Sequence, residues 1–118
     1  MRRGPERQLQ VAVCGHLAAR AAPGVVWFHV PNGGSRNVIE ATNLKRMGTK
    51  AGVSDLILLH KGKAYALELK AGKQGPSENQ REFMDAVNNA GGYATCAVGI
   101  DQVVKVLETW ELLRRAAE

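Results

Sequence analysis

The chain has 118 residues, of which 45% are hydrophobic and 23% charged; this is the size and composition of one globular domain, not of a disordered tail. No apolar run approaches the ~20 residues that a membrane-spanning helix needs, and the N-terminus contains no apolar stretch typical of a signal peptide. We therefore expect a cytoplasmic protein without membrane association and a single domain over residues 1–118. Two cysteines, Cys14 and Cys96, are too few for a zinc cage or a disulfide framework, so we expect two reduced, half-buried thiols.

The positive charge is concentrated in the first half of the chain. The net charge is +5. Residues 1–50 contain eight Lys and Arg and two acidic residues, whereas residues 51–118 contain eight Lys and Arg and nine acidic residues. Basic residues cluster within 32–50, and such a patch suits a polyanion, because phosphate contacts supply most of the non-specific affinity for nucleic acids. A solvated basic face that only aids solubility is the alternative interpretation.

The first half of the chain predicts two helices, a strand and a turn-rich loop. Apolar residues recur at helical spacing over residues 5–21, and Pro23-Gly24 ends that helix. The β-branched and aromatic run 25–30 predicts a strand, and Pro, Asn, Gly and Ser at 31–35 favour a loop. Residues 37–47 are assigned to a short helix.

The second half predicts a hairpin and a further strand. Strands are expected at 55–59 and 64–70, joined as a hairpin through 60–63, and again at 93–99. With the helices, these strands predict an α/β fold class, in which a central mixed sheet of about four strands is flanked by helices.

Two sequence signals mark the starts of the helices in this half. Ser77 and Gln80 match the S-x-x-Q capping box, in which each side chain binds a free backbone N–H group, and that helix is expected to continue to about Ala90. Asp101 is expected to cap a last helix that continues to about Ala116.

The register of the hairpin brings charged side chains together. If the turn has its tip at Lys61-Gly62, pairing outward along both strands sets Asp55 opposite Glu68. Directly opposed residues of an antiparallel pair share one face, with Cβ atoms ~4.5–5.5 Å apart. Lys70 lies two residues beyond Glu68 and therefore on the same face. The three side chains are expected to converge at the open end of the hairpin.

This convergence predicts a divalent metal site. Apolar residues on both faces of 55–59 predict a strand covered on both sides, and two carboxylates ~5 Å apart repel by about 3 kcal/mol at an effective dielectric constant of ~20. A cation offsets that repulsion, and carboxylate oxygens suit Mg²⁺ or Mn²⁺. The alternative is a surface acid pair with Lys70 as its counter-charge.

The order of these motifs resembles the PD-(D/E)xK nuclease superfamily. Asp55, followed by Glu68 and Lys70 at a strand end, matches its D…(D/E)xK signature, although Ser54 stands where the superfamily often has proline. The wider pattern resembles the VRR-NUC family, particularly its small stand-alone members, from Glu6 to about residue 92. The matching segments are VPNGGSR at 30–36, LKRMG at 44–48, KAGVSD at 50–55, ELK at 68–70 and SENQ at 77–80. The resemblance implies a restriction-endonuclease-like core.

The resemblance also implies a role for each residue of the central motif. Asp55 and Glu68 would bind the metal, with the Leu69 carbonyl as a further ligand. Lys70 would orient or help to deprotonate the attacking water and balance charge in the transition state.

Two further residues match the family outside that motif. Glu6 matches the acidic residue that such nucleases often have on the first helix, and its spacing continues the apolar stripe that faces the sheet; an acid favoured by the helix N-terminus is the alternative. Gln80 matches the family's glutamine after ExK, and its role in the capping box is compatible with a place in the site.

We therefore expect a Mg²⁺- or Mn²⁺-dependent deoxyribonuclease that hydrolyses DNA phosphodiester bonds. The candidates for phosphate contacts are Arg36, Lys45, Arg46, Lys50 and Lys73. Similarity to stand-alone family members suggests a homodimer that acts on branched DNA such as four-way (Holliday) junctions. A non-catalytic nucleic-acid-binding module that retains the nuclease fold is the alternative, and the intact set of two acids and a lysine argues against it.

Overall fold

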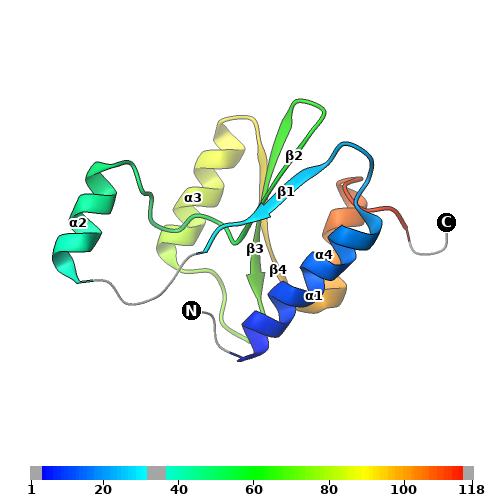
Figure 1. Cartoon of the computed structure of the whole chain (residues 1–118), viewed down its shortest axis with the longest axis horizontal. Coiled ribbons are helices and arrows are strands. Elements are labelled where there is room, and N and C mark those ends of the chain that lie inside the picture. The colour runs from blue at the N-terminus through cyan, green and yellow to red at the C-terminus, as the bar shows by residue number, and fades with distance from the viewer. Residues whose placement is uncertain (1–3, 32–36, 116–118) are drawn as a thin grey trace.

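A four-stranded mixed sheet with helices on both faces organises the part of the chain that the structure describes, residues 4–31 and 37–115 (Figure 1). In this computed structural model the strands follow one another across the sheet in chain order: β1 (Val26–His29), β2 (Leu56–His60), β3 (Lys63–Lys70) and β4 (Tyr93–Val98). The β1–β2 and β2–β3 pairs are antiparallel, and the β3–β4 pair is parallel. The helices are α1 (Gly4–Arg20), α2 (Val38–Arg46), α3 (Glu78–Asn89) and α4 (Gly99–Thr109). The predicted α/β fold with a mixed four-stranded sheet is confirmed. Within the described ranges, no helix is long and apolar enough to cross a membrane.

The core lies between the sheet and the pair of helices α1 and α4. The buried apolar side chains of this layer include those of Leu9, Val13, Leu17, Leu56, Leu58, Leu67, Leu69, Val103 and Leu107. Burial of one such side chain stabilises the fold by about 1.5–3 kcal/mol. Because strand side chains alternate between the two faces, this layer fixes β2 and β3 and directs the intervening residues, Asp55 and Glu68 among them, to the opposite face.

The opposite face of the sheet is only half covered. α3 packs on β3 and β4, and its residue Met84 is buried. On β1 and β2 the side chains of Val26, Phe28 and Leu59 are 56%, 46% and 43% exposed. The expectation that residues 55–59 are covered on both sides is therefore wrong for the C-terminal part of β2, although Asp55 at the other end is buried.

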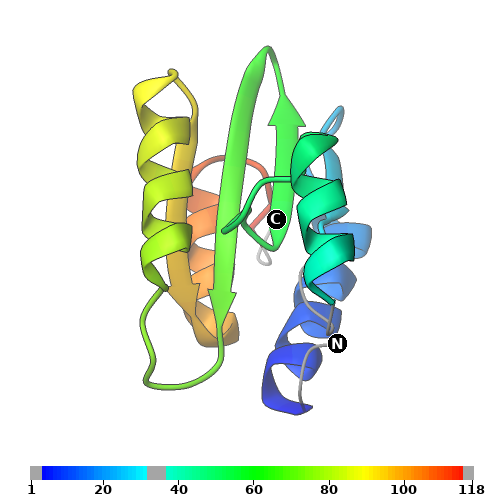
Figure 2. The same ribbon diagram turned by 90° about the vertical axis from the view of Figure 1, so that its left-hand side faces the viewer.

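α2 stands apart from the sheet, on the same side as α3 (Figures 1 and 2). No other element of the described chain packs against it, and none of its nine residues is buried. Its start is capped by Asn37, whose Oδ1 accepts a hydrogen bond from the backbone N of Glu40 at 2.7 Å, and Met47 is the C-cap. The helix predicted over residues 37–47 is confirmed.

The hairpin between β2 and β3 has the predicted register. His60 lies opposite Lys63 at the turn. Lys61 and Gly62 both have positive φ, 51° and 77°, as a two-residue type I′ turn requires. A Cβ disfavours this conformation, yet Lys61 adopts it, and the ladder that follows extends to Leu56 opposite Leu67, one residue short of the two acids.

The last helix begins two residues before the predicted cap. α4 starts at Gly99, and Asp101 lies inside its first turn. The Gln102 side chain accepts a hydrogen bond from the backbone N of Val98 at 2.8 Å. The N-cap residue is Val98, so the prediction that Asp101 is the N-cap is wrong.

The same helix also ends earlier than predicted. α4 stops at Thr109 rather than continuing toward Ala116. Glu111 has a φ of 63°, and the chain turns there so that Leu112 and Leu113 are buried against the core. Burial of these two side chains overrides the helical pattern of the sequence.

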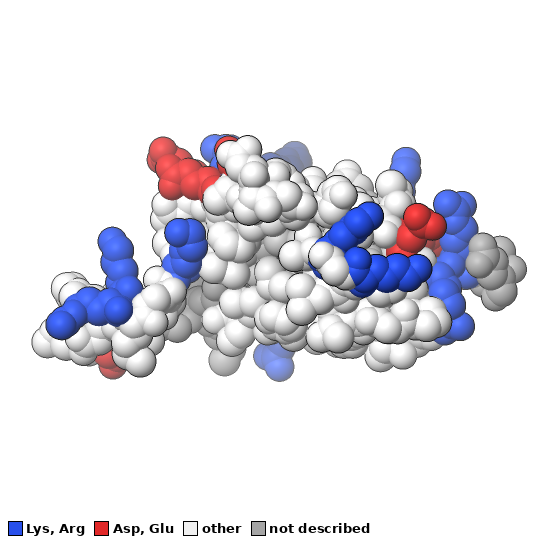
Figure 3. Space-filling model, turned by 90° about the horizontal axis from the view of Figure 1, so that it is seen from above, with Lys and Arg blue, Asp and Glu red and all other residues white. Residues whose placement is uncertain are grey.

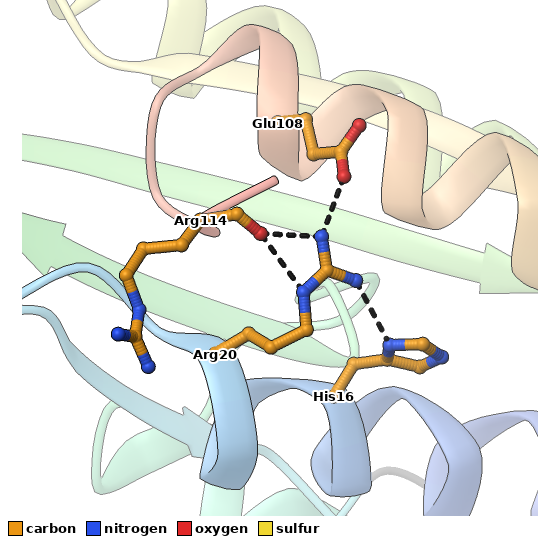
Figure 4. Close-up of polar contacts among 4 residues, drawn as sticks. All are labelled: His16, Arg20, Glu108 and Arg114. Carbon is orange, nitrogen blue, oxygen red and sulfur yellow. Dashed lines mark hydrogen bonds and ion pairs between the residues drawn. The ribbon is translucent and has the colours of Figure 1, made fainter. Parts of the chain in front are cut away.

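Arg20 ties the end of α1 to α4 and to the C-terminal segment (Figure 4). Its Nη2 donates to Glu108 Oε2 at 2.6 Å, its Nε donates to the carbonyl of Arg114 at 2.8 Å, and its Nη1 lies 3.3 Å from Nδ1 of His16. The backbone N of Arg114 donates in turn to the carbonyl of Arg20 at 2.8 Å. These contacts hold the C-terminal segment against the first helix.

Candidate active site

Asp55 and Glu68 lie side by side at the open end of the β2–β3 hairpin. The ladder ends with Leu56 opposite Leu67, and Asp55 and Glu68 are the residues that follow this pair toward the open end. Asp55 is 3% exposed and Glu68 is 2% exposed. The fold therefore holds two carboxylates next to each other and shields both from solvent.

Backbone groups from two neighbouring strands fix Asp55. Its Oδ2 accepts a hydrogen bond from the backbone N of Leu69 at 2.9 Å. Its carbonyl accepts one from the backbone N of Val30 at 2.8 Å and lies 3.0 Å from Nδ1 of His29. Because the N–H and C=O groups of one strand residue point to the same neighbour, the Leu69 carbonyl is directed toward the Asp55 side of β3.

Lys70 adds a positive charge beside Glu68. Its Nζ lies 3.6 Å from Glu68 Oε2, and the two side chains are 15% and 3% exposed. Residues two apart on a strand share one face, so this ion pair follows from the ExK spacing. Lys70 thus places one ammonium beside the two carboxylates, and the formal charges of Asp55, Glu68 and Lys70 sum to −1 when all three are ionised.

The pKa of the Cys96 thiol on β4 is influenced by the same charged side chains. Cys96 lies next to Glu68 across the parallel β3–β4 pair. Burial raises the pKa of this thiol above its usual value, and the carboxylates of Glu68 and Asp55 raise it further, while Lys70 lowers it. Cys14 and Cys96 are both free and half-buried, as the sequence predicts.

The oxygen donors of this site suit a hard divalent cation. Mg²⁺ is usually held by one or two carboxylates together with waters and substrate phosphates. Among the described residues, no group of three or more His, Cys, Asp and Glu side chains could hold a metal ion. The side chains that fit such an ion here are therefore a pair, Asp55 and Glu68, with the Leu69 carbonyl beside them.

The first turn of α1 lies at the same end of the sheet as the C-terminal end of β3 (Figures 1 and 2). Glu6 in this turn is half-buried, in agreement with its predicted orientation. One turn later Gln10 is 7% exposed; its Nε2 donates to Cys14 Sγ at 3.4 Å, and its Oε1 has no hydrogen-bond partner among the described residues. Gln10 was not predicted as a candidate site residue, although its position four residues after Glu6 puts both on one helix face.

The start of α3 has the predicted capping box. The backbone N of Gln80 donates to Ser77 Oγ at 3.2 Å, and the backbone N of Ser77 donates to Gln80 Oε1 at 2.8 Å. The side-chain oxygen of Gln80 is therefore engaged in the cap, which leaves its amide nitrogen as the group that a site role would use.

The loop before Asp55 lies directly against this first turn of α3. Gly52 has a φ of +79°, and a Cβ at this position would lie 2.2 Å from the carbonyl oxygen of Asn79. Ser54 is fully buried, and its Oγ has no hydrogen-bond partner in the described part of the chain. Gly52 was also missed, because its contact joins two segments that are distant in sequence.

The candidate phosphate-binding residues lie on two segments outside the acid pair. Lys45 and Arg46 are exposed in the last turn of α2, and Lys50 is exposed in the loop that follows. Lys73 is exposed in the loop between β3 and α3. Arg36 lies outside the described residues. Figure 3 shows Lys and Arg side chains on the end of the molecule formed by α2.

A groove of about 840 Å³ lies between α2 and α3. Leu44 and Lys45 line it from α2, Lys50 lines it from the connecting loop, and Gln80 and Phe83 line it from α3. The loop that forms part of its wall, residues 49–53, leads into Asp55 two residues later.

The fold is similar to that of a solved structure described as a VRR_NUC domain protein. The two share 27% sequence identity with a TM-score of 0.75, over 95% of this chain and 93% of the other. No family model and no curated protein matches the sequence. The similarity over nearly the whole of both chains confirms the restriction-endonuclease-like fold and the family resemblance inferred from the sequence motifs.

Proposed function

Because the chain resembles the VRR-NUC family of nuclease domains in its motifs and in its fold, we propose that it is a metal-dependent DNA endonuclease that hydrolyses phosphodiester bonds. The observation that carries this proposal is the buried Asp55–Glu68 pair with Lys70 Nζ 3.6 Å from Glu68 Oε2. Residues 1–118 would form one such domain, and its cytoplasmic location stays a prediction.

The electrostatics of the pair favours a cation as an additional partner. Two carboxylates ~5 Å apart repel by about 3 kcal/mol at an effective dielectric constant of ~20. Lys70 supplies a single positive charge, and both acids are nearly without solvent exposure. Asp55, Glu68 and the Leu69 carbonyl would hold Mg²⁺ or Mn²⁺, which supplies Lewis-acid polarisation of the scissile phosphate and a lower pKa for a bound water.

The residues of this chain would then position the water and the phosphate. Lys70 would donate a hydrogen bond to the attacking oxygen, orient it and stabilise its charge as it forms a bond to phosphorus and the bond to the leaving oxygen breaks. Gln80 would contribute its amide nitrogen from the start of α3, where free N–H groups also favour an anion. Glu6, at the same end of the sheet, would act as an additional acidic residue of the site.

The basic residues would bind the DNA backbone on either side of the site. Lys45, Arg46 and Lys50 on and after α2, Lys73 after β3, and Arg36 are the candidates for phosphate contacts. Such contacts position DNA without reading its sequence, which suits an enzyme that recognises a DNA structure such as a four-way junction.

Exposed apolar side chains on and just after α2 support a homodimer. Val38, Ile39 and Met47 are 81%, 73% and 80% exposed, and no element of the described chain covers this helix. Isolated helices shorter than ~12–15 residues are marginal in water, so a partner surface would stabilise a nine-residue helix. A second copy of the chain would supply that surface and a second active site, which cleavage of both strands of a junction requires.

A non-catalytic binding module is the competing function. A module of this kind would need the basic residues but neither the buried acids nor the lysine. The presence of Asp55, Glu68 and Lys70 in one buried cluster argues for catalysis.

Cleavage assays on labelled DNA test the proposal directly. Purified protein is incubated with single-stranded, duplex, flap and four-way-junction DNA in chelator, Mg²⁺ or Mn²⁺. We expect metal-dependent cleavage by the wild type and a loss of at least about a hundredfold in Lys70→Ala, the lower range for removal of a group that acts in proton transfer. Lys105→Ala, which removes an exposed lysine on α4, is the matched control and should cleave normally. Cleavage by Lys70→Ala at the wild-type rate, or by the wild type in chelator, would contradict the assignment.

A further inference from the structure

The groove between α2 and α3 is lined by both apolar and basic side chains, and Asp55, Glu68 and Lys70 are not among its lining residues. Leu44 of α2, Val53 of the connecting loop and Phe83 of α3 give it apolar sides. Lys45 and Lys50 are exposed and line the same groove. The two helices that form the groove lie on the same side of the sheet (Figures 1 and 2).

This pairing of apolar walls with lysines matches the chemistry of an unpaired nucleotide. Proteins that bind single strands combine a positively charged groove for the phosphates with aromatic side chains on which bases stack. Phe83 offers the aromatic ring and Lys45 and Lys50 offer the charges. A protein segment would need no lysines here, and the only acidic lining residue among the described ones is Glu82.

The size of the groove distinguishes unpaired nucleotides from a duplex. Its volume of about 840 Å³ falls within the ~300–1,000 Å³ of pockets that enclose a small ligand. A duplex, whose major groove alone is ~12 Å wide, is too large to enter. The space suits the base and sugar of very few nucleotides.

The groove is lined by the loop that leads into Asp55. Gly52, at its wall, lies against the backbone of Asn79 so closely that a Cβ would be 2.2 Å from the Asn79 carbonyl oxygen. Three residues later the same loop reaches Asp55, and Gln80 lines the groove from the start of α3. The groove and the acid pair are therefore connected by one short loop and by the start of α3.

From these observations we propose that the α2–α3 groove binds an unpaired nucleotide of the DNA substrate, so that the enzyme selects DNA with a single-stranded segment over continuous duplex. The inference rests on the proposed nuclease function and names its substrate class. The base packs against Phe83 and Leu44, and the flanking phosphates contact Lys45 and Lys50.

Binding without metal tests the groove separately from catalysis. Affinities of the full chain are measured in chelator for a blunt duplex and for the same duplex with a short single-stranded thymidine tail, with 2-aminopurine at the first unpaired position in a parallel set. The wild type should bind the tailed DNA more tightly and change the 2-aminopurine fluorescence. Phe83→Ala should lower the preference for the tail about tenfold, within the range for loss of one base–aromatic contact, whereas Phe83→Tyr should keep it.

Matched variants exclude simpler explanations. Phe28→Ala removes a half-exposed phenylalanine outside the groove and should leave the preference unchanged. Lys73→Ala removes an exposed lysine that does not line the groove and should weaken binding to both DNAs by the same factor, because a phosphate contact outside the groove does not distinguish them. If Phe83→Ala fails to fold, Leu44→Ser provides the same measurement from the other wall.

Three results would overturn the inference. The first is equal affinity of the wild type for tailed and blunt DNA. The second is a Phe83→Tyr variant that is as impaired as Phe83→Ala. The third is a set of groove variants that change the sedimentation coefficient but not the preference for tailed DNA, which would identify a second copy as the occupant. A preserved preference in a protein that cleaves no DNA would instead reject the proposed nuclease function and leave the groove assignment standing.

Discussion

Gly52 holds the loop before Asp55 against the first turn of α3. Its φ of +79° lies in the left-handed region, and an added Cβ would lie 2.2 Å from the Asn79 carbonyl oxygen. Gly62 has a similar φ of +77°, but a Cβ there meets no described atom within 4 Å. Substitution of Gly62 therefore measures the cost of backbone strain alone, whereas substitution of Gly52 adds the cost of a steric clash.

We expect Gly52→Ala to destabilise the fold more than Gly62→Ala. The second change should cost about 1–2 kcal/mol, the strain of a left-handed L residue. The first adds a backbone clash that pushes the loop off α3, moves Asp55 and abolishes metal-dependent cleavage. Urea titrations and cleavage assays on both variants measure the difference. Equal stability losses, with cleavage intact in Gly52→Ala, would mean that this contact does not position the acid.

At the scale of single residues, the sequence predicted contacts within the hairpin and missed contacts between distant segments. The hairpin register was predicted correctly as far as Leu56 opposite Leu67, because strand periodicity and one turn determine it. Gln10 and Gly52 were missed because their positions depend on how α1 and α3 pack. Strand periodicity also failed to show that Leu59 is 43% exposed, since coverage of a sheet face depends on which helix lies there.

At the scale of elements, local signals located most starts and ends. Asn37 and Ser77 cap α2 and α3 through their own side chains, and such bonds form between residues close in sequence. The end of α4 was not predictable in this way. Its apolar spacing continues past Thr109, but Leu112 and Leu113 reach the core only if the helix stops.

The Arg20 contacts between α1, α4 and the C-terminal segment should contribute to stability and not to activity. The Arg20 and Glu108 side chains are 19% and 26% exposed, so their ion pair is partly shielded from solvent. Arg20→Met keeps the aliphatic stem and removes the donors, and we expect a loss of about 1–2 kcal/mol in the free energy of unfolding with unchanged cleavage. Arg81→Met, at an exposed position on α3, is the control; a loss of equal size there would remove the special role of Arg20.

The exposed apolar side chains of α2 should determine the oligomeric state of the protein. If a second copy covers Ile39, which is 73% exposed, the wild type sediments as a dimer and Ile39→Ser raises the dimer dissociation constant at least about tenfold, since burial of such a side chain stabilises by about 1.5–3 kcal/mol. Val11→Ser changes a residue of α1 that is 64% exposed and should have no effect. A wild type that stays monomeric at high concentration would contradict the homodimer.

At the scale of the whole molecule, the buried layer explains why the fold was predictable and the site was only partly so. The apolar residues of α1, β2, β3 and α4 recur at spacings that specify one layer. The polar site lies on the other face, where α3 covers half of the sheet and α2 covers none of the described strands. Few elements pack on this face of the sheet, so fewer patterns in the sequence predict where the residues of the site lie.

Metal binding should connect the site to global stability. The fold holds Asp55 and Glu68 buried, with the ammonium of Lys70 beside Glu68, and two neighbouring carboxylates repel one another. A ligand that binds only the folded state stabilises it by about 1.4 kcal/mol at ten times its Kd, which for a domain of 118 residues raises Tm by several degrees. We therefore expect Mn²⁺ to raise the Tm of the wild type relative to chelator.

Asp55→Asn should reverse this pattern, because it removes the charge and keeps the shape. The amide oxygen of the introduced asparagine can still accept the hydrogen bond that Leu69 N donates to Asp55 at 2.9 Å, so the metal-free variant should melt at or above the wild-type temperature and lose most of the Mn²⁺ response. Asp85→Asn, an equal change at an exposed position on α3, should respond to Mn²⁺ like the wild type. Melting curves of the three proteins in chelator, Mg²⁺ and Mn²⁺ supply the comparison. An Mn²⁺ shift of equal size in Asp55→Asn would mean that the cation binds elsewhere, and the paired carboxylates would then need another explanation than a metal.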